Sequence, residues 1–207
     1  MSYLKFEHAL MTNLQESLPK ELLRTNRSGA YSCSTIVDCN TRKYHGLLVV
    51  PVPELDDDNH VLLSSLDCTV VQHGAEFNLG LHKYQSNHFS PNGHKYIREF
   101  DCDRVPTTLY RVGGVILKKE VVFQHYEDRI LIRYTLVDCH SATTLRFRPF
   151  LLLEVCANLR MRMELPVAII LPWTMASRLV CMPVILIYIC SFPRKTSSIS
   201  CPIGIVA

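Results

Sequence analysis

The sequence predicts a mainly β protein, an antiparallel β-sandwich, on three observations. Val115–Phe123 and Arg129–Val137 are rich in β-branched and apolar residues, and the short turn Tyr126–Asp128 between them is typical of a hairpin. Polar and apolar residues alternate from Leu145 to Phe150, which is the period of a strand with one solvated face. Only Ala9–Leu18 carries leucines at helical spacing. Many short strands separated by turns favour a large antiparallel sandwich over an α/β fold.

The other expected strands follow from β-branched or aromatic runs bounded by turn residues. Gly113 and Gly114 predict the turn between the last of them and the strand that begins at Val115. In chain order these strands are Ala30–Ile36, Gly46–Val50, His60–Leu66, Cys68–Gln72, Tyr96–Cys102 and Thr107–Val112.

Composition limits the partners and the compartment. The net charge is +3, and basic and acidic residues are interspersed, so a nucleic-acid partner is not expected. The segment Met1–Glu7 has no apolar stretch behind a basic start, so no secretory signal is expected. The nine cysteines lack C-x-x-C spacing and are interpreted as reduced core residues, with a disulfide framework as the alternative. We therefore expect a cytoplasmic protein.

Two loops offer metal-ligating side chains without the spacing that known sites use. The acidic segment Pro51–Asn59 lacks the alternating aspartates and closing glutamate of a calcium loop. His82, His88 and His94 are six residues apart, which does not give the close pair found in most zinc sites. The sequence therefore predicts two polar loops, no metal and no cofactor.

Two polar motifs precede strands in the first quarter of the chain. A T-N-x-x-G-x-Y turn spans Thr25–Tyr31, and the run N-T-R-K-Y-H-G-L-L spans Asn40–Leu48. Together they resemble the N-terminal domain of bacterial and archaeal glycogen debranching enzymes. The likeness extends from Leu4 to Phe150 and includes Asp101, Tyr110-Arg111-Val112 and Arg146-Phe147-Arg148-Pro149-Phe150.

The resemblance implies a β-supersandwich placed before an (α/α)6 barrel that has no counterpart in these 207 residues. It also implies an amylo-alpha-1,6-glucosidase-type glycoside hydrolase that cuts the α-1,6 branch points of glycogen or a related α-glucan. Some members also transfer maltooligosaccharides as 4-α-glucanotransferases. The family's catalytic acids are assigned to the barrel, so we expect no catalytic residue here and no activity from the chain alone. Asp38, Asp67, Glu99 and Asp101 are interpreted as structural.

The two motifs supply the candidate substrate-binding or domain-interface residues. Tyrosine stacks on a pyranose ring, and arginine or asparagine bonds its hydroxyls, so these side chains could line a glucan groove facing the barrel. Alternatively, they satisfy buried backbone groups at the interface with the barrel. The candidates are Asn26, Tyr31, Asn40, Thr41, Arg42, Tyr44 and His45.

The chain divides into residues 1–153, the sandwich domain, and residues 154–207, a hydrophobic tail. Only two of the 19 acidic residues, Glu154 and Glu164, lie in the tail, together with four of the nine cysteines. Codons that encode the tail can be chosen so that a shifted reading frame encodes a peptide with acidic, glycine and aromatic residues, as in the rest of the domain. We expect an out-of-frame tail of a truncated domain, with no selected fold and therefore disordered. Natural divergence and a membrane anchor at 165–192 are the alternatives, although Arg178, Pro172 and Pro183 interrupt that anchor.

Three classes of function remain open. The first is a fragment of a glycogen debranching enzyme, with glycogen and the catalytic barrel as its partners. The second is a non-catalytic carbohydrate-binding module that acts alone, which predicts retention on glycogen or amylose without turnover. The third is a membrane-attached protein, which predicts fractionation with lipid.

Overall fold

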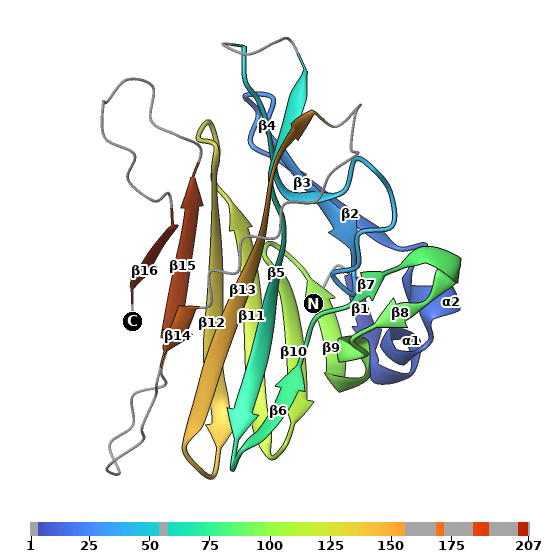
Figure 1. Cartoon of the computed structure of the whole chain (residues 1–207), viewed down its shortest axis with the longest axis vertical. Helices are drawn as coiled ribbons and strands as arrows, with labels where there is room; N and C mark the ends of the chain where they lie inside the picture. Colours follow the sequence, from blue (N-terminus) through green and yellow to red (C-terminus); the bar gives the residue numbers. More distant parts are fainter. Residues whose placement is uncertain (1–3, 54–57, 156–168, 172–183, 191–202, 207) are drawn as a thin grey trace.

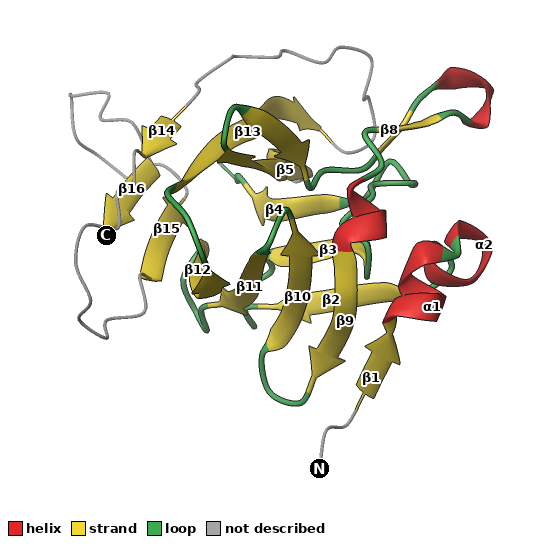
Figure 2. Cartoon of the chain, turned by 90° about the horizontal axis from the view of Figure 1, so that it is seen from below, coloured by secondary structure: helices red, strands yellow, loops and turns green. Residues whose placement is uncertain are grey.

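The structure is a computed structural model that describes residues 4–53, 58–155, 169–171, 184–190 and 203–206, with side chains described for 4–53 and 58–151. Two antiparallel sheets pack face to face (Figures 1 and 2). The first has the strand order β1-β9-β10-β11-β12-β15-β16. The second has the order β14-β13-β5-β4-β3-β2, with β6 also paired to β5. The predicted fold class, a mainly β antiparallel sandwich, is therefore confirmed.

The strands of the first sheet are β1 (Leu4–Glu7), β9 (Ile97–Cys102), β10 (Pro106–Val112), β11 (Val115–Phe123), β12 (Arg129–Cys139), β15 (Val184–Cys190) and β16 (Ile203–Val206). Those of the second are β2 (Glu21–Thr25), β3 (Tyr31–Thr35), β4 (Gly46–Pro51), β5 (Asn59–Gln72), β6 (Ala75–Asn78), β13 (Thr143–Val155) and β14 (Ile169–Leu171). A small hairpin pairs β7 (His82–Lys83) with β8 (Phe89–Ser90). The helices are α1 (His8–Thr12), α2 (Leu14–Ser17), η1 (Gln85–Asn87) and η2 (Gly93–Tyr96).

The core lies between the two sheets. Tyr134 of β12 and Phe147 of β13 are fully buried, and their ring centroids are 4.9 Å apart. Leu117 from the first sheet and Leu63 from the second belong to the same apolar cluster. Burying each such side chain stabilises the fold by about 1.5–3 kcal/mol. The apolar side chains that point inward from alternate strand positions therefore provide the main stabilisation of the sandwich.

The predicted hairpin is confirmed: Val115–Phe123 is β11, and the second run extends two residues further to become β12. The two strands expected at His60–Leu66 and Cys68–Gln72 were wrong as separate elements, because β5 runs unbroken through both. Asp67 resembles a polar break in the sequence. In the fold it is buried and paired with His82 Nε2 at 2.9 Å, so the strand continues through it.

The single helix predicted over Ala9–Leu18 was also wrong, because it divides into α1 and α2 at Asn13. Asn13 is extended (φ −87°, ψ 101°), and its side chain accepts a hydrogen bond from the Gln15 N–H at 3.1 Å. An asparagine competes with helix continuation in this way because its oxygen caps a new N-terminus.

Several described strands were not predicted from the sequence, and β1, β2 and β6 are three of them. Each has a pairing partner on one side, namely β9, β3 and β5 respectively. Short edge strands bury few side chains, so their sequences carry weak alternation. The polar turn begins at Thr25, the last residue of β2, and this strand carries part of the site described below.

A close approach of strands fixes the start of β4. A Cβ atom on Gly46 would lie 2.7 Å from Val49 Cγ2 and 3.1 Å from Val61 Cγ1. Glycine is therefore required where the polar run meets the sheet. Val49 and Val61 are fully buried, and Tyr31 packs against them.

The segment 154–207 is described only in part. Its strand β14 pairs with β13, β15 pairs with β12, and β16 pairs with β15. The rest of the tail lies outside the described residues, as do Glu54, Asp56 and Asp57 of the acidic loop. The domain boundary at residue 153, the out-of-frame tail and its lack of a selected fold stay predictions. Helices in the described part of the chain are too short and too polar to cross a membrane.

Candidate functional site

The turn between β2 and β3 is built on Asn26, which is fully buried. Its Oδ1 accepts hydrogen bonds from the N–H groups of Ser28 (2.9 Å) and Ala30 (3.0 Å). Its Nδ2 donates to the Glu127 carbonyl (3.2 Å) and to Asp128 Oδ1 (2.8 Å). Asn26 thus joins the turn of one sheet to the β11–β12 hairpin of the other, which is a structural role.

The loop before β4 is held by Asn40. Its Nδ2 donates to the Ser64 carbonyl at 2.8 Å, and its Oδ1 accepts from the Ser34 hydroxyl at 2.9 Å. Thr41 closes the loop, because its N–H donates to His45 Nδ1 at 3.1 Å. Asn40 and Thr41 therefore fix the loop through groups inside the domain.

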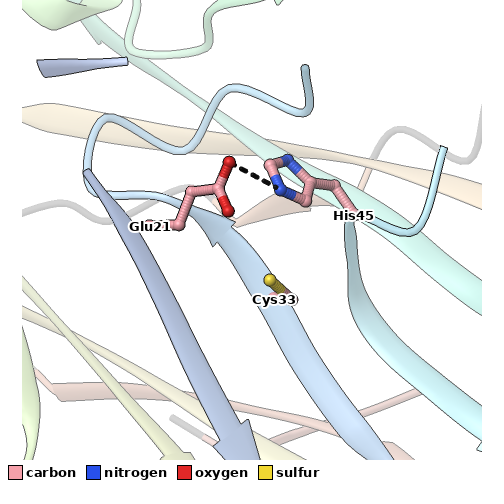
Figure 3. A group of neighbouring side chains, drawn as sticks. All are labelled: Glu21, Cys33 and His45. Carbon is pink, nitrogen blue, oxygen red and sulfur yellow. Dashed lines mark ion pairs between the residues drawn. The ribbon is translucent and has the colours of Figure 1, made fainter. Parts of the chain in front are cut away.

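A cluster of three ionisable side chains lies where β2, β3 and this loop meet (Figure 3). Glu21 Oε1 lies 3.4 Å from His45 Nε2 and 2.8 Å from Arg42 Nε. The ligand atoms of Glu21, Cys33 and His45 all lie within 4.8 Å of one another. The His45 side chain is 2% exposed, whereas that of Arg42 is 67% exposed. We call Glu21, Cys33 and His45 the β2–β3 cluster.

Burial sets the protonation states in this cluster. It lowers the pKa of the His45 imidazole, and the neighbouring Glu21 opposes that shift. Burial, followed by Glu21, raises the pKa of the Cys33 thiol. At neutral pH these two shifts favour a neutral imidazole and a neutral thiol beside Glu21. A neutral thiol of this kind is a poor nucleophile.

An open groove lies on the outer face of β2 and β3, beside the cluster. It encloses about 980 Å³, including space open to solvent. Leu23 and Tyr44 are 60% and 52% exposed on its wall, and the Tyr31 hydroxyl donates to the Tyr44 carbonyl at 3.1 Å. We call this the outer groove; it is lined by Leu23, Thr25, Arg27, Gly29, Ala30, Tyr31, Cys33 and Tyr44.

A second polar group lies between the sheets. Lys119 Nζ is 2.7 Å from Asp38 Oδ2, and the Tyr110 hydroxyl donates to the same oxygen at 3.3 Å. Burial and the neighbouring Asp38 raise the pKa of Tyr110 well above its usual value. The adjacent cavity also borders Asp67, whose carboxylate pairs with His82. These carboxylates hold internal partners, in line with their structural interpretation.

The structure thus divides the predicted site residues into two groups. Asn26, Asn40, Thr41 and His45 point into the domain or its loop, whereas Tyr31, Arg42 and Tyr44 reach its outer face. His82, His88 and His94 do not gather: the first pairs with Asp67, and the other two join no metal-ligand group among the described residues.

Glu21, Cys33 and Leu23 were missed as site residues. Glu21 and Leu23 lie on β2, an edge strand that the sequence did not predict. Cys33 lies on β3, and its sequence context does not distinguish it from the other cysteines interpreted as core residues. The available signal was the alternation of Glu21, Leu23 and Thr25 on one side of a five-residue strand, opposite Cys33 on β3. Pairing across the two strands brings these residues together, and pairing is a tertiary property.

The comparisons with known proteins agree with this fold. The family model described as glycogen debranching enzyme N terminal matches residues 20–154, well over half of the chain. Searches of curated proteins and of solved structures found no match. The matched segment begins one residue before β2 and ends in β13, so it contains the turn, the loop, the β2–β3 cluster and the outer groove. The chain belongs to the family of glycogen debranching enzyme N-terminal domains.

Proposed function

We propose that this chain serves as the non-catalytic N-terminal domain of a cytoplasmic glycogen debranching enzyme that acts on α-1,6 branch points of glycogen-like glucans. The family match over residues 20–154 and the antiparallel sandwich support the proposal. In it, the catalytic acids stand on an α/α barrel that packs on this domain. Whether the enzyme also transfers maltooligosaccharides depends on the barrel.

The internal pairing of carboxylates supports a non-catalytic role. Glycoside hydrolysis usually needs two carboxyl groups that flank the scissile bond and remain free to exchange a proton or attack the sugar. Asp38 is paired with Lys119, Asp67 with His82, and Glu99 with Lys5 at 3.0 Å. We expect the purified chain to release no glucose from a branched limit dextrin. Release above that of a heat-inactivated sample would overturn this part of the proposal.

The outer groove carries the proposal for what this domain contributes. An exposed leucine beside an exposed tyrosine is typical of a protein interface, where both bury apolar area. The Tyr31 hydroxyl is already bonded within the domain, and Leu23 and Tyr44 are the exposed large apolar side chains of the groove, so these two gain most from a partner. We therefore assign the groove first to packing against the catalytic barrel.

Direct glucan contact is the second candidate, and the exposed polar edge of the groove favours it. Lys43 Nζ lies 4.8 Å from the centroid of the Tyr44 ring, and Arg42 extends into solvent. A tyrosine face bordered by cationic donors can stack on a sugar and bond its hydroxyls. The same surface acting alone would constitute a carbohydrate-binding module.

The Tyr44→Ala and Leu23→Ser variants of the intact enzyme separate these roles. If the groove packs on the barrel, both variants lower the melting temperature of the enzyme and leave its glycogen affinity unchanged. If it contacts glucan, Tyr44→Ala weakens glycogen binding at an unchanged melting temperature, and Leu23→Ser has little effect. Tyr84→Ala is the matched control, because Tyr84 is 47% exposed and lies outside the groove. Wild-type behaviour of both groove variants would contradict any role for the groove.

A further inference from the structure

The β2–β3 cluster has the spacing of metal ligands. The His45 Nε2 to Glu21 Oε1 separation of 3.4 Å is long for a hydrogen bond. It is close to the roughly 3.3 Å that separates a nitrogen and an oxygen bound tetrahedrally to one zinc ion. The Cys33 sulfur completes a set in which every pair of ligand atoms lies within 4.8 Å. Three different segments of the chain supply the three ligands.

His45 presents an unused nitrogen to this set. Nε2 is buried and has no hydrogen-bond partner among the described residues, beyond its long contact with Glu21. The Cys39 carbonyl is a second hydrogen-bond acceptor beside the imidazole, and since Nε2 has no such bond, a proton on Nδ1 would be donated to this carbonyl. A ring that donates Nδ1–H to a backbone carbonyl has its lone pair on Nε2, which is the usual arrangement of a zinc-bound histidine.

The Nδ1 atom of His45 can hydrogen-bond with either of two backbone groups, the Thr41 N–H or the Cys39 carbonyl. In the metal-free form Nδ1 accepts from the Thr41 N–H at 3.1 Å, which places the proton on Nε2. Metal binding reverses this: the proton moves to Nδ1, the Thr41 bond is exchanged for the bond to Cys39, and Nε2 becomes a ligand. The site is therefore coupled to the conformation of the loop that carries Tyr44.

We propose that Glu21, Cys33 and His45 form a zinc site that joins β2, β3 and the loop before β4. A thiolate, an imidazole and a carboxylate form a ligand set suited to Zn²⁺ and unsuited to Mg²⁺ or Ca²⁺, which prefer oxygen. The two anionic ligands neutralise the ion. Arg42, largely exposed, holds Glu21 in the metal-free form and can move away. Cys33 also lines the outer groove, so the cluster borders that groove.

Binding has a defined proton balance. A cysteine ligand binds zinc as the thiolate, so the step is Cys33–SH + Zn²⁺ → Cys33–S⁻–Zn²⁺ + H⁺, with no change of oxidation state. The His45 proton moves from one ring nitrogen to the other without release. Calorimetry in buffers of different ionisation enthalpy should therefore report about one proton released per zinc.

The decisive experiment compares two cysteine variants of the full chain. Zinc affinity is measured by competition with a chromophoric chelator for wild type, Cys33→Ser and Cys139→Ser, the last being a half-buried cysteine on β12 away from the cluster. We expect one zinc per chain, an affinity at least about tenfold weaker for Cys33→Ser, and wild-type affinity for Cys139→Ser. Far-ultraviolet circular dichroism checks that each variant is folded.

Cobalt gives a readout that does not depend on affinity. Co²⁺ bound by wild type should show the thiolate-to-metal charge-transfer band of a tetrahedral site, and this band should persist in Cys139→Ser and vanish in Cys33→Ser. The Glu21→Gln variant, which retains the local shape, should keep the band and bind more weakly. Equal zinc binding by Cys33→Ser and wild type, or a cobalt spectrum without a thiolate band, would overturn the proposal.

Discussion

The Asn26 side chain uses all four hydrogen bonds that an amide can form. Two of them satisfy the backbone of its own turn, and two hold the β11–β12 hairpin of the other sheet. At Asn26, the motif that identified the family therefore links two parts of the domain by hydrogen bonds and does not form a binding surface.

The Asn26→Ala variant should lower the free energy of unfolding by about 3 kcal/mol, because the N–H groups of Ser28 and the buried Ala30 lose their acceptor and the link to the β11–β12 hairpin is lost. Urea unfolding measures this directly. The exposed Asn92 makes no side-chain cap bond, so Asn92→Ala should change the same free energy by less than about 0.5 kcal/mol. Equal losses in the two variants would contradict the assigned role.

Two buried histidines make stability depend on pH. Burial lowers the pKa of His45 and of His94 below the unfolded value of 6.5. The unfolded chain then binds protons more readily, so this stabilisation is complete above pH 6.5 and is lost as the pH falls through the folded pKa values. The lowered pKa of Glu120 acts only below its unfolded value of 4.5, which leaves the interval between 4.5 and 6.5 to the histidines.

We expect the free energy of unfolding to fall steadily from about pH 7 to about pH 5. Urea unfolding at several pH values tests this. The His94→Gln variant should show a shallower slope, and His88→Gln, at an exposed position, should retain the wild-type slope. A flat wild-type profile would exclude buried neutral histidines.

Between secondary-structure elements, the pair Asp38–Lys119 links the loop after β3 to the centre of β11. Asp38 has a positive φ of 57°, a conformation that asparagine also tolerates. Lys119 is buried, so its ammonium group depends on this partner.

The Asp38→Asn variant should cost about 2 kcal/mol, because it leaves a buried charge without its counter-ion. Lys119→Met removes that charge, so the double variant should be less destabilised than the sum of the two single changes. A double-mutant cycle by urea unfolding measures the coupling. Strict additivity would show that the two side chains act independently.

Sequence patterns predicted well the elements that have neighbours on both sides. Strands β10, β11 and β12 followed from their runs of β-branched, aromatic and apolar residues, which pack well on the pleated surface of a sheet. Asp67 suggests a strand break that the fold does not have, and Asn13 introduces a helix break that the leucine spacing does not suggest. A distant histidine keeps Asp67 inside a strand, whereas the local cap at Asn13 interrupts a helix that its leucines favour.

The candidate site was predicted in part. The polar run and turn were found by their uncommon residues, but which of their side chains reach solvent was not. Tyr44 and His45 are adjacent in sequence, yet the first is half exposed and the second is buried. The direction of each side chain depends on where Gly46 enters β4, and that is set by Val61 on another strand.

At the scale of the whole molecule, the question is whether the strands of the segment 154–207 contribute to the stability of the sandwich. Strand β15 pairs with the edge of β12, and β16 pairs with β15. We propose from its composition that the tail is out of frame, in which case this pairing contributes little to stability. The nucleotide sequence beyond the codon for Leu153 tests the frame itself.

A chain that ends at Val155 should then have the same free energy of unfolding as the full chain, within about 0.5 kcal/mol. It should also aggregate less, because an apolar, cysteine-rich segment is removed. Urea unfolding and size-exclusion chromatography measure the two effects. A loss above about 2 kcal/mol would instead assign β15 to the fold.

The sequence by itself determined the class of fold, the family and the two polar motifs, because alternation and uncommon residues are local properties that need no partner to be seen. The tertiary structure decided the rest. Only the pairing of β3 with both β2 and β4 brings Glu21, Cys33 and His45 together, and only packing separates the buried asparagines from the exposed tyrosines. Contacts between residues far apart in the chain depend on register and sheet order, which alternation along a single strand does not specify.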